Sequence, residues 1–170
     1  MIIKTRKYKL ENKMYVTLAM KHLLRTQWKW AVIPVAIILL NVVLNVTRAY
    51  HNIWIYFVAP LAVLLYLLFW FIQFTGVTQM EQSKPMFQKF TYEIDSRQIV
   101  MKLNTKEGMQ LKWENIKEAH KEKEHFLLFF SRVQFLHLPF SIFNSENDIR
   151  FMESILKRKN LLKEKELIKQ

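Results

Sequence analysis

The sequence predicts an α+β membrane protein: a membrane helical hairpin followed by an antiparallel sheet domain that ends in a helix. Two uncharged apolar runs, residues 30–46 and 53–72, are separated by a short polar break. After residue 89 apolar and polar residues alternate in short segments, as in strands with one buried face. Apolar residues return at helical spacing near the carboxyl end. These patterns divide the chain into a basic arm (1–29), the hairpin (30–72), a linker (73–88) and a C-terminal domain (89–170).

The composition narrows the classes of function. With 170 residues the chain has room for one ordinary domain, or for a smaller domain with a membrane anchor. It contains no cysteine, which excludes disulfides, thiolate zinc sites and cysteine nucleophiles. A net charge of +12 can indicate nucleic-acid binding, but here the excess lies next to a predicted span, where anionic inner-leaflet lipid accounts for it. No groove-reading or phosphate-binding motif is present, so we expect no nucleic-acid partner.

The basic arm, residues 1–29, carries eight Lys and Arg residues against one Glu. Its first part, Ile2–Leu10, mixes apolar and basic residues and is either a short edge strand or a disordered arm. From Asn12 onward apolar residues recur at helical spacing. This spacing predicts an amphipathic helix that lies along the cytoplasmic surface of the membrane and runs into the first span.

Five residues are predicted to anchor the helices at the membrane interface: Trp28, Lys29, Trp30, Trp54 and Trp70. Indole rings and the ammonium end of a lysine both favour the level of the lipid headgroups. Any interfacial helix needs this chemistry, so we favour simple anchoring over a specific lipid sensor.

The hairpin is predicted to cross the membrane twice. A bilayer core about 30 Å thick takes about 20 apolar helical residues, a length that residues 53–72 reach and residues 30–46 approach. Basic flanks beside a span prefer the cytoplasmic side. Only the connector is poor in Lys and Arg, so we expect both termini in the cytoplasm and Arg48 and His51 outside. The predicted location is therefore the cell membrane, with its anionic inner leaflet as the lipid partner.

Three hairpin residues are predicted to pack the two spans together: Asn41, Asn45 and Pro60. The asparagines are four residues apart and so share one face of a helix. Pro60 leaves the carbonyl of Tyr56 without its helical donor, and we expect the Asn41 amide to replace that donor. The alternative is a substrate or ion path. It is disfavoured because the spans contain no Asp, Glu, Lys or Arg.

The C-terminal domain is predicted from six short strands and one helix. Gly76 is expected to end the second span in a left-handed conformation, and Gly108 to occupy a positive-φ turn position. The expected strands are Phe90–Ile94, Ile99–Leu103, Met109–Trp113, Ile116–His120, Phe126–Phe130 and Gln134–Leu138. Strands this closely spaced form an antiparallel meander that curls into a barrel or a sandwich. Ser145 and Asp148 have the spacing of a capping box, which predicts the final helix.

The string FTYEIDSRQIVMKLNTKEGMQLKWENIKEAHKEKEHFLLFF and the segment after it contain four distinctive positions: Trp113, Ile116, Pro139 and Phe143. With the paired spans, these residues resemble the YcxB-like family of bacterial membrane proteins. The resemblance implies a cytoplasmic domain similar to a pleckstrin-homology (PH) fold, an antiparallel β-barrel closed by a C-terminal helix. Such a barrel usually has seven strands, and we expect Ile3–Leu10 to supply the seventh. The resemblance implies no catalytic residues.

No catalytic, cofactor or metal site is predicted. His120 and His125 flank the charged run Lys121–Glu124, which fits a solvated hairpin tip better than a set of metal ligands. The sequence has no P-loop, nucleophile elbow or HExxH motif. We therefore expect a non-enzymatic membrane protein whose cytoplasmic domain binds a second copy or a membrane protein partner. The alternative is a membrane-stress or peptide-resistance factor that acts through the hairpin.

Overall fold

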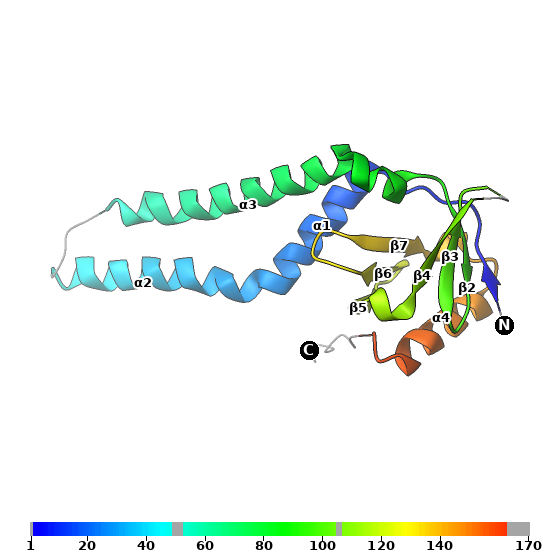
Figure 1. The fold of residues 1–170 in the computed structure, drawn as a ribbon. Coiled ribbons are helices and arrows are strands. Elements are labelled where there is room, and N and C mark those ends of the chain that lie inside the picture. The colour runs from blue at the N-terminus through cyan, green and yellow to red at the C-terminus, as the bar shows by residue number, and fades with distance from the viewer. Residues whose placement is uncertain (1, 49–52, 105–106, 163–170) are drawn as a thin grey trace. The chain divides into compact units, whose positions relative to one another are not determined.

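A computed structural model divides the chain into two compact units (Figure 1). The helical unit contains residues 11–83, and the sheet unit contains residues 1–10 together with residues 84–170. The structure describes residues 2–48, 53–104 and 107–162. In these residues it has N-terminal helices, two antiparallel sheets and a C-terminal helix, so the predicted α+β class is confirmed.

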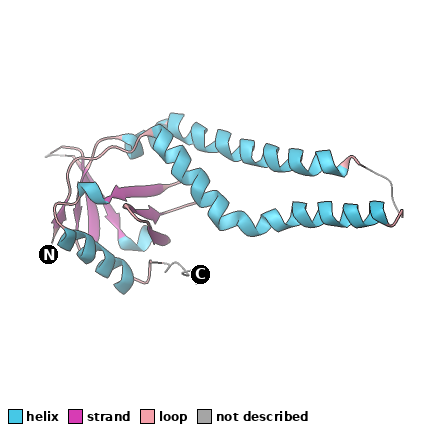
Figure 2. Cartoon of the chain, turned by 180° about the vertical axis from the view of Figure 1, so that it is seen from behind, coloured by secondary structure: helices cyan, strands magenta, loops and turns pink. Residues whose placement is uncertain are grey.

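Three helices form the helical unit: α1 (Asn12–Gln27), α2 (Val32–Val46) and α3 (Ile55–Gln79). A 3₁₀ segment, η1 (Trp28–Ala31), joins α1 to α2. α2 and α3 lie side by side and antiparallel, as Figures 1 and 2 both show. The hydroxyl of Tyr66 in α3 donates a hydrogen bond to Oε1 of Gln27, which ties α3 to the end of α1.

One helix of this unit, α3, is long and apolar enough to cross a membrane. α1 and α2 pass the same test of length and composition only as a pair, and they are bent by 43° at η1. By itself α2 has 15 residues, about 22 Å at the usual helical rise, which is less than the bilayer core. The described residues therefore contain one candidate span, and a second one if the bent pair is counted as a single span.

Helix α3 runs past the end that the sequence predicts. The expected left-handed Gly76 is helical, and no glycine among the described residues has a positive φ. Phe74 and Val77 are buried in these last turns, and their burial outweighs the cost of about 1 kcal/mol that one glycine imposes on a helix. Gly108 likewise begins a strand instead of occupying a left-handed turn. A 3₁₀ segment, η2 (Glu81–Phe87), follows α3.

The predicted outer connector is described only at its start. α2 ends at Val46, and Arg48 has a φ of 56°, in the left-handed region that commonly terminates a helix. Residues 49–52, which include His51, lie outside the described residues.

The first sheet has the strand order β1-β2-β3-β4 and is antiparallel throughout. Its strands are β1 (Ile3–Lys4), β2 (Thr91–Ile94), β3 (Gln98–Lys102) and β4 (Gly108–Lys112). The expected extra strand from residues 3–10 is confirmed at Ile3–Lys4, which pairs with β2. Between β2 and β3, a carboxylate oxygen of Asp95 accepts hydrogen bonds from the backbone N–H groups of Arg97 and Gln98, which fixes the tight turn.

The second sheet has the order β5-β6-β7 and is also antiparallel. Its strands are β5 (Glu118–Lys121), β6 (His125–Phe129) and β7 (Phe135–Pro139). The chain returns to its edge after the last helix. There Ala119 and Leu162 form a parallel bridge, and Ala119 donates a backbone hydrogen bond of 2.8 Å to Leu161.

The closed barrel implied by the family resemblance is not found. Among the described residues no ladder joins β4 to β5 or β7 to β1. A 3₁₀ turn, η3 (Trp113–Asn115), lies between β4 and β5. Because this turn redirects the backbone, β5 begins a second sheet and does not extend the first. For the same reason the strand predicted at residues 109–113 ends one residue early, at Lys112, and the strand predicted at residues 116–120 begins only at Glu118.

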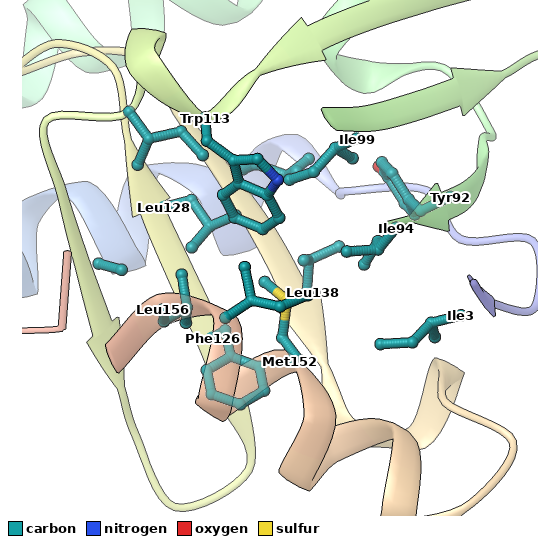
Figure 3. Close-up of a cluster of buried hydrophobic side chains, with 14 of the residues drawn as sticks. Ile3, Tyr92, Ile94, Ile99, Trp113, Phe126, Leu128, Leu138, Met152 and Leu156 are labelled. Carbon is teal, nitrogen blue, oxygen red and sulfur yellow. The ribbon is translucent and has the colours of Figure 1, made fainter. Parts of the chain in front are cut away.

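Helix α4 (Glu146–Arg158) packs against one hydrophobic core shared with both sheets. Its predicted capping box is confirmed. Asp148 N–H donates to Ser145 Oγ and Ser145 N–H donates to an Asp148 carboxylate oxygen, each at 3.2 Å. A short 3₁₀ turn, η4 (Phe140–Ile142), precedes the helix. Figure 3 shows side chains from β1, both sheets and α4 meeting in this core; the labelled ones are Ile3, Tyr92, Ile94, Ile99, Trp113, Phe126, Leu128, Leu138, Met152 and Leu156.

Candidate functional site

Segments distant in sequence hold the amino-terminal arm, residues 3–10, along its length. Thr5 N–H donates to the carbonyl of Tyr92, and Tyr92 N–H donates to Thr5 Oγ1, both at 2.9 Å. Further along, Tyr8 and Phe90 exchange two backbone hydrogen bonds of 2.8 and 2.9 Å. The alternative of a disordered basic arm is therefore excluded for these residues.

The arm ends at a cluster of one tyrosine and two histidines: Tyr8, His125 and His137. The Tyr8 hydroxyl lies 2.6 Å from His137 Nδ1. The imidazole rings of His125 and His137 have centroids 4.7 Å apart in an edge-on arrangement. His125 faces Pro139 and Leu127 faces His137 in the β6–β7 ladder, so the two imidazoles are diagonal neighbours on one face of the sheet.

Burial controls the protonation of His137. His137 is only 4% exposed. Burial, and to a lesser extent the nearby His125, lowers the pKa of His137 to about 4. His137 is therefore neutral at physiological pH, and its Nδ1 can accept a hydrogen bond from the Tyr8 hydroxyl. Protonation would turn that acceptor into a donor and place a charge in a buried site. The cluster can thus hold the arm at neutral pH and weaken its attachment in acid.

The contact between His125 and His137 was not predicted from the sequence. The charged run after His120 is a hairpin tip as predicted, closed by a 2.9 Å bond from Glu122 N–H to the carbonyl of His125. His120 lies 3.3 Å from a carboxylate oxygen of Glu118. Tyr8 was missed because nothing in its local sequence indicates a contact 129 residues away.

The four distinctive residues of the C-terminal domain, Trp113, Ile116, Pro139 and Phe143, lie in or beside the hydrophobic core. Trp113 is 1% exposed, and its indole N–H donates a 3.0 Å hydrogen bond to the carbonyl of Asp95 at the β2–β3 turn. Ile116 and Phe143 are also part of the buried core. Pro139 ends β7 opposite His125. These residues hold the two sheets, η3 and η4 together, and they do not form a polar pocket.

The five predicted anchors are not equivalent. Trp28, Trp30 and Trp54 are each more than 60% exposed, and Lys29 is exposed too. Trp70 is partly buried and packs against Phe74, with ring centroids 5.5 Å apart. The exposed tryptophans are available to an interface, whereas Trp70 contributes to packing within α3.

The predicted packing residues of the hairpin meet only in part. Asn41 is 2% exposed, the one buried side chain of α2. Asn45 Nδ2 donates to the Asn41 carbonyl at 2.8 Å and to its side-chain oxygen at 3.0 Å. The expected bond from Asn41 to the Tyr56 carbonyl is absent, because Asn41 Nδ2 has no partner among the described residues. The asparagines therefore pair with each other along α2, and Pro60 lines an apolar groove instead.

The chain thus contains an α+β unit of two sheets and a helix, and a second unit of apolar helices is inserted into it in the sequence. Within the α+β unit, residues 94–156 match the family model described as YcxB-like protein. The matched segment begins at the end of β2, includes both hairpins of the second sheet and ends inside α4. No curated protein and no solved structure matches the chain.

Proposed function

We propose that this chain is a non-enzymatic integral membrane protein that presents a cytoplasmic binding module. The helical unit is the anchor, the sheet unit is the module, and the ligand is a second copy or another membrane protein. The observation that carries this proposal is the pairing of β1 with β2.

That pairing constrains the topology of the chain. Residues 3–10 and residues 84–162 belong to one folded unit, so the segment between them leaves this unit and returns to it. If the segment enters a membrane, it must cross an even number of times. One crossing by α3 and one by the bent pair α1–α2 satisfy this condition.

The charge distribution favours one side of the membrane for the two termini. Between Glu11 and Glu81 there is no acidic residue, and Lys13, Lys21, Arg25 and Lys29 all lie before the first apolar run. Basic residues next to a span favour the cytoplasmic side and its anionic lipids. Both termini and the sheet unit are therefore cytoplasmic in this proposal.

The binding surface we favour is the open edge of the first sheet. β4 is the end strand of the order β1-β2-β3-β4, and most of its residues are exposed. Met109 on this strand is 52% exposed. An exposed edge strand can add an extended segment from a partner through backbone hydrogen bonds.

Site-specific crosslinking in intact membranes tests this assignment. A photoreactive residue at Met109 should give a protein adduct, whereas the same group at the exposed Asn147 on α4 should give little. Equal adducts at both positions, or lipid adducts alone, would refute a binding edge at β4.

The PH-like arrangement is also part of the proposal. The seven strands β1–β7 and the final helix support it, while the open edge at β4 departs from a closed barrel.

A further inference from the structure

An apolar groove of about 800 Å³ runs along the helical unit. It is formed by all three helices, with Met20 from α1, Pro34 and Ile38 from α2, and Ala59, Val63 and Phe71 from α3 among its lining residues. Ala59 is the smallest side chain in the lining, and proline stands on both α2 and α3 at Pro34 and Pro60.

The chemistry of the lining points to one kind of ligand group. Every lining side chain is hydrocarbon except for the thioether of Met20. No lining side chain can donate or accept a strong hydrogen bond, so the side chains of the groove cannot orient a polar molecule. Its volume is in the range of about 300–1,000 Å³ that is typical of small-molecule sites. A flexible hydrocarbon chain matches it in both polarity and size.

Basic residues follow the lining residue Met20 at helical spacing in the sequence. Met20 is followed directly by Lys21, and Arg25 and Lys29 lie on the next turns of α1 and in η1. All three cations are exposed. A negatively charged headgroup gains roughly 1 kcal/mol for each such basic residue near a membrane surface.

We propose that the groove binds an acyl chain of an anionic phospholipid, whose phosphate lies against Lys21, Arg25 and Lys29. The inference rests on the membrane placement in the proposed function, and it names a specific lipid site that simple anchoring does not require. A second copy of the chain is the competing occupant. It is disfavoured because a two-fold pair would bring two stretches of the same positive charge to the same membrane level.

Spin-labelled lipids test the proposal on the full-length protein in vesicles. The association constant of phosphatidylglycerol, obtained from its motionally restricted fraction, should exceed that of phosphatidylcholine by at least about fivefold, the factor that corresponds to one of the three basic contacts. Ala59→Phe fills the groove and should remove this excess. Val58→Phe, at an exposed position outside the lining, should leave it unchanged. Replacing Lys21, Arg25 and Lys29 by Gln should make the two lipids equal.

Several results would overturn the lipid site. These are equal retention of both lipids by the unmodified protein, an excess that survives Ala59→Phe, or a crosslinked dimer that Ala59→Phe disrupts. Val63→Phe fills the same groove from another turn of α3 and replaces Ala59→Phe if that variant loses its helical circular dichroism. Membrane fractionation separates the two proposals. A protein absent from membranes refutes the proposed function, whereas a membrane-bound protein without lipid preference refutes only the groove.

Discussion

Ile3 pairs with Ile94 across the antiparallel β1–β2 ladder, and both side chains are buried in the core. This contact joins the two sequence segments of the sheet unit, residues 1–10 and residues 84–170, between which the helical unit is inserted in the chain. Two properties follow from it: the stability of the sheet unit depends on its first residues, and the inserted segment starts and ends at the same unit. The contact of Tyr8 with His137 attaches the arm at a second point.

Ile3→Ala should lower the free energy of unfolding of the sheet unit by about 2–4 kcal/mol, because it leaves a cavity at a fully buried position. Ile2→Ala is the matched control, since Ile2 is 61% exposed and should change stability by less than about 0.5 kcal/mol. Hydrogen exchange of the β2 amides in the full-length protein measures both. Equal protection in the two variants would mean that β1 does not belong to the folded core.

Acid should destabilise the sheet unit through His137. Its folded pKa of about 4 lies below the ordinary value near 6.5, so the unfolded chain binds the proton first. This contribution to stability is complete above about pH 6.5 and is lost as the pH falls toward 4. The loss amounts to about 3 kcal/mol. Urea denaturation between pH 7.5 and 4.5 measures it.

Two variants separate His137 from other titrating groups. His137→Phe should flatten the profile between pH 6.5 and 4.5. Tyr8→Phe should keep the slope but lower stability at pH 7.5 by about 1 kcal/mol, the usual net value of one hydrogen bond. Lys102 beside Glu93 and Lys121 beside Glu153 lower the pKa values of these two carboxyl groups. Their contributions to stability are therefore lost only at lower pH than that of His137. An unchanged slope in His137→Phe would contradict this assignment.

The prediction of α4 from its cap can be tested at a single hydroxyl. Ser145→Ala removes the side chain that accepts from Asp148 N–H and should cost about 1 kcal/mol of unfolding free energy. Ser141 is also exposed but caps no helix, so Ser141→Ala should cost less than about 0.5 kcal/mol. Chemical denaturation at neutral pH compares the two, and similar losses would show that the capping box does not stabilise α4.

Asn41→Leu should leave the stability of the helical unit nearly unchanged, within about 0.6 kcal/mol, when the protein is unfolded in detergent. The reason is that Asn41 Nδ2 is buried without a hydrogen-bond partner, so its removal offsets the loss of the bond from Asn45. Asn45→Leu serves as the comparison because it removes the hydrogen bonds that Asn45 Nδ2 donates to Asn41 on the same face. A loss above about 2 kcal/mol in Asn41→Leu would indicate a bond between the two helices.

Local pattern predicted most of the secondary structure. Alternation located the six strands that follow residue 89, and the Ser145–Asp148 spacing located α4. The pattern of Ile2–Leu10 left an edge strand and a disordered arm open, and the strand was preferred because the expected sheet required one more; it is observed at Ile3–Lys4. The division into two sheets was not predictable in this way, since it depends on a three-residue turn at Trp113–Asn115 that interrupts pairing.

The histidine cluster shows where sequence reasoning stops. His125 and His137 could be placed on neighbouring strands, but whether they share a face depends on the register of β6 and β7. That register is set by the turn in which Phe130 N–H donates to the carbonyl of Gln134. The third member, Tyr8, is brought in by the path of the arm along β2, which is a property of the tertiary fold.

Cysteine accessibility in intact cells tests the central claim, a hairpin whose two ends return to one cytoplasmic unit. The chain has no cysteine of its own, so single substitutions report one site each. With a membrane-impermeant maleimide, Thr47→Cys should be labelled from outside, whereas Lys7→Cys and Asn147→Cys should be labelled only after permeabilisation. Labelling of Lys7→Cys and Asn147→Cys from opposite sides, or of all three from the same side, would contradict the account.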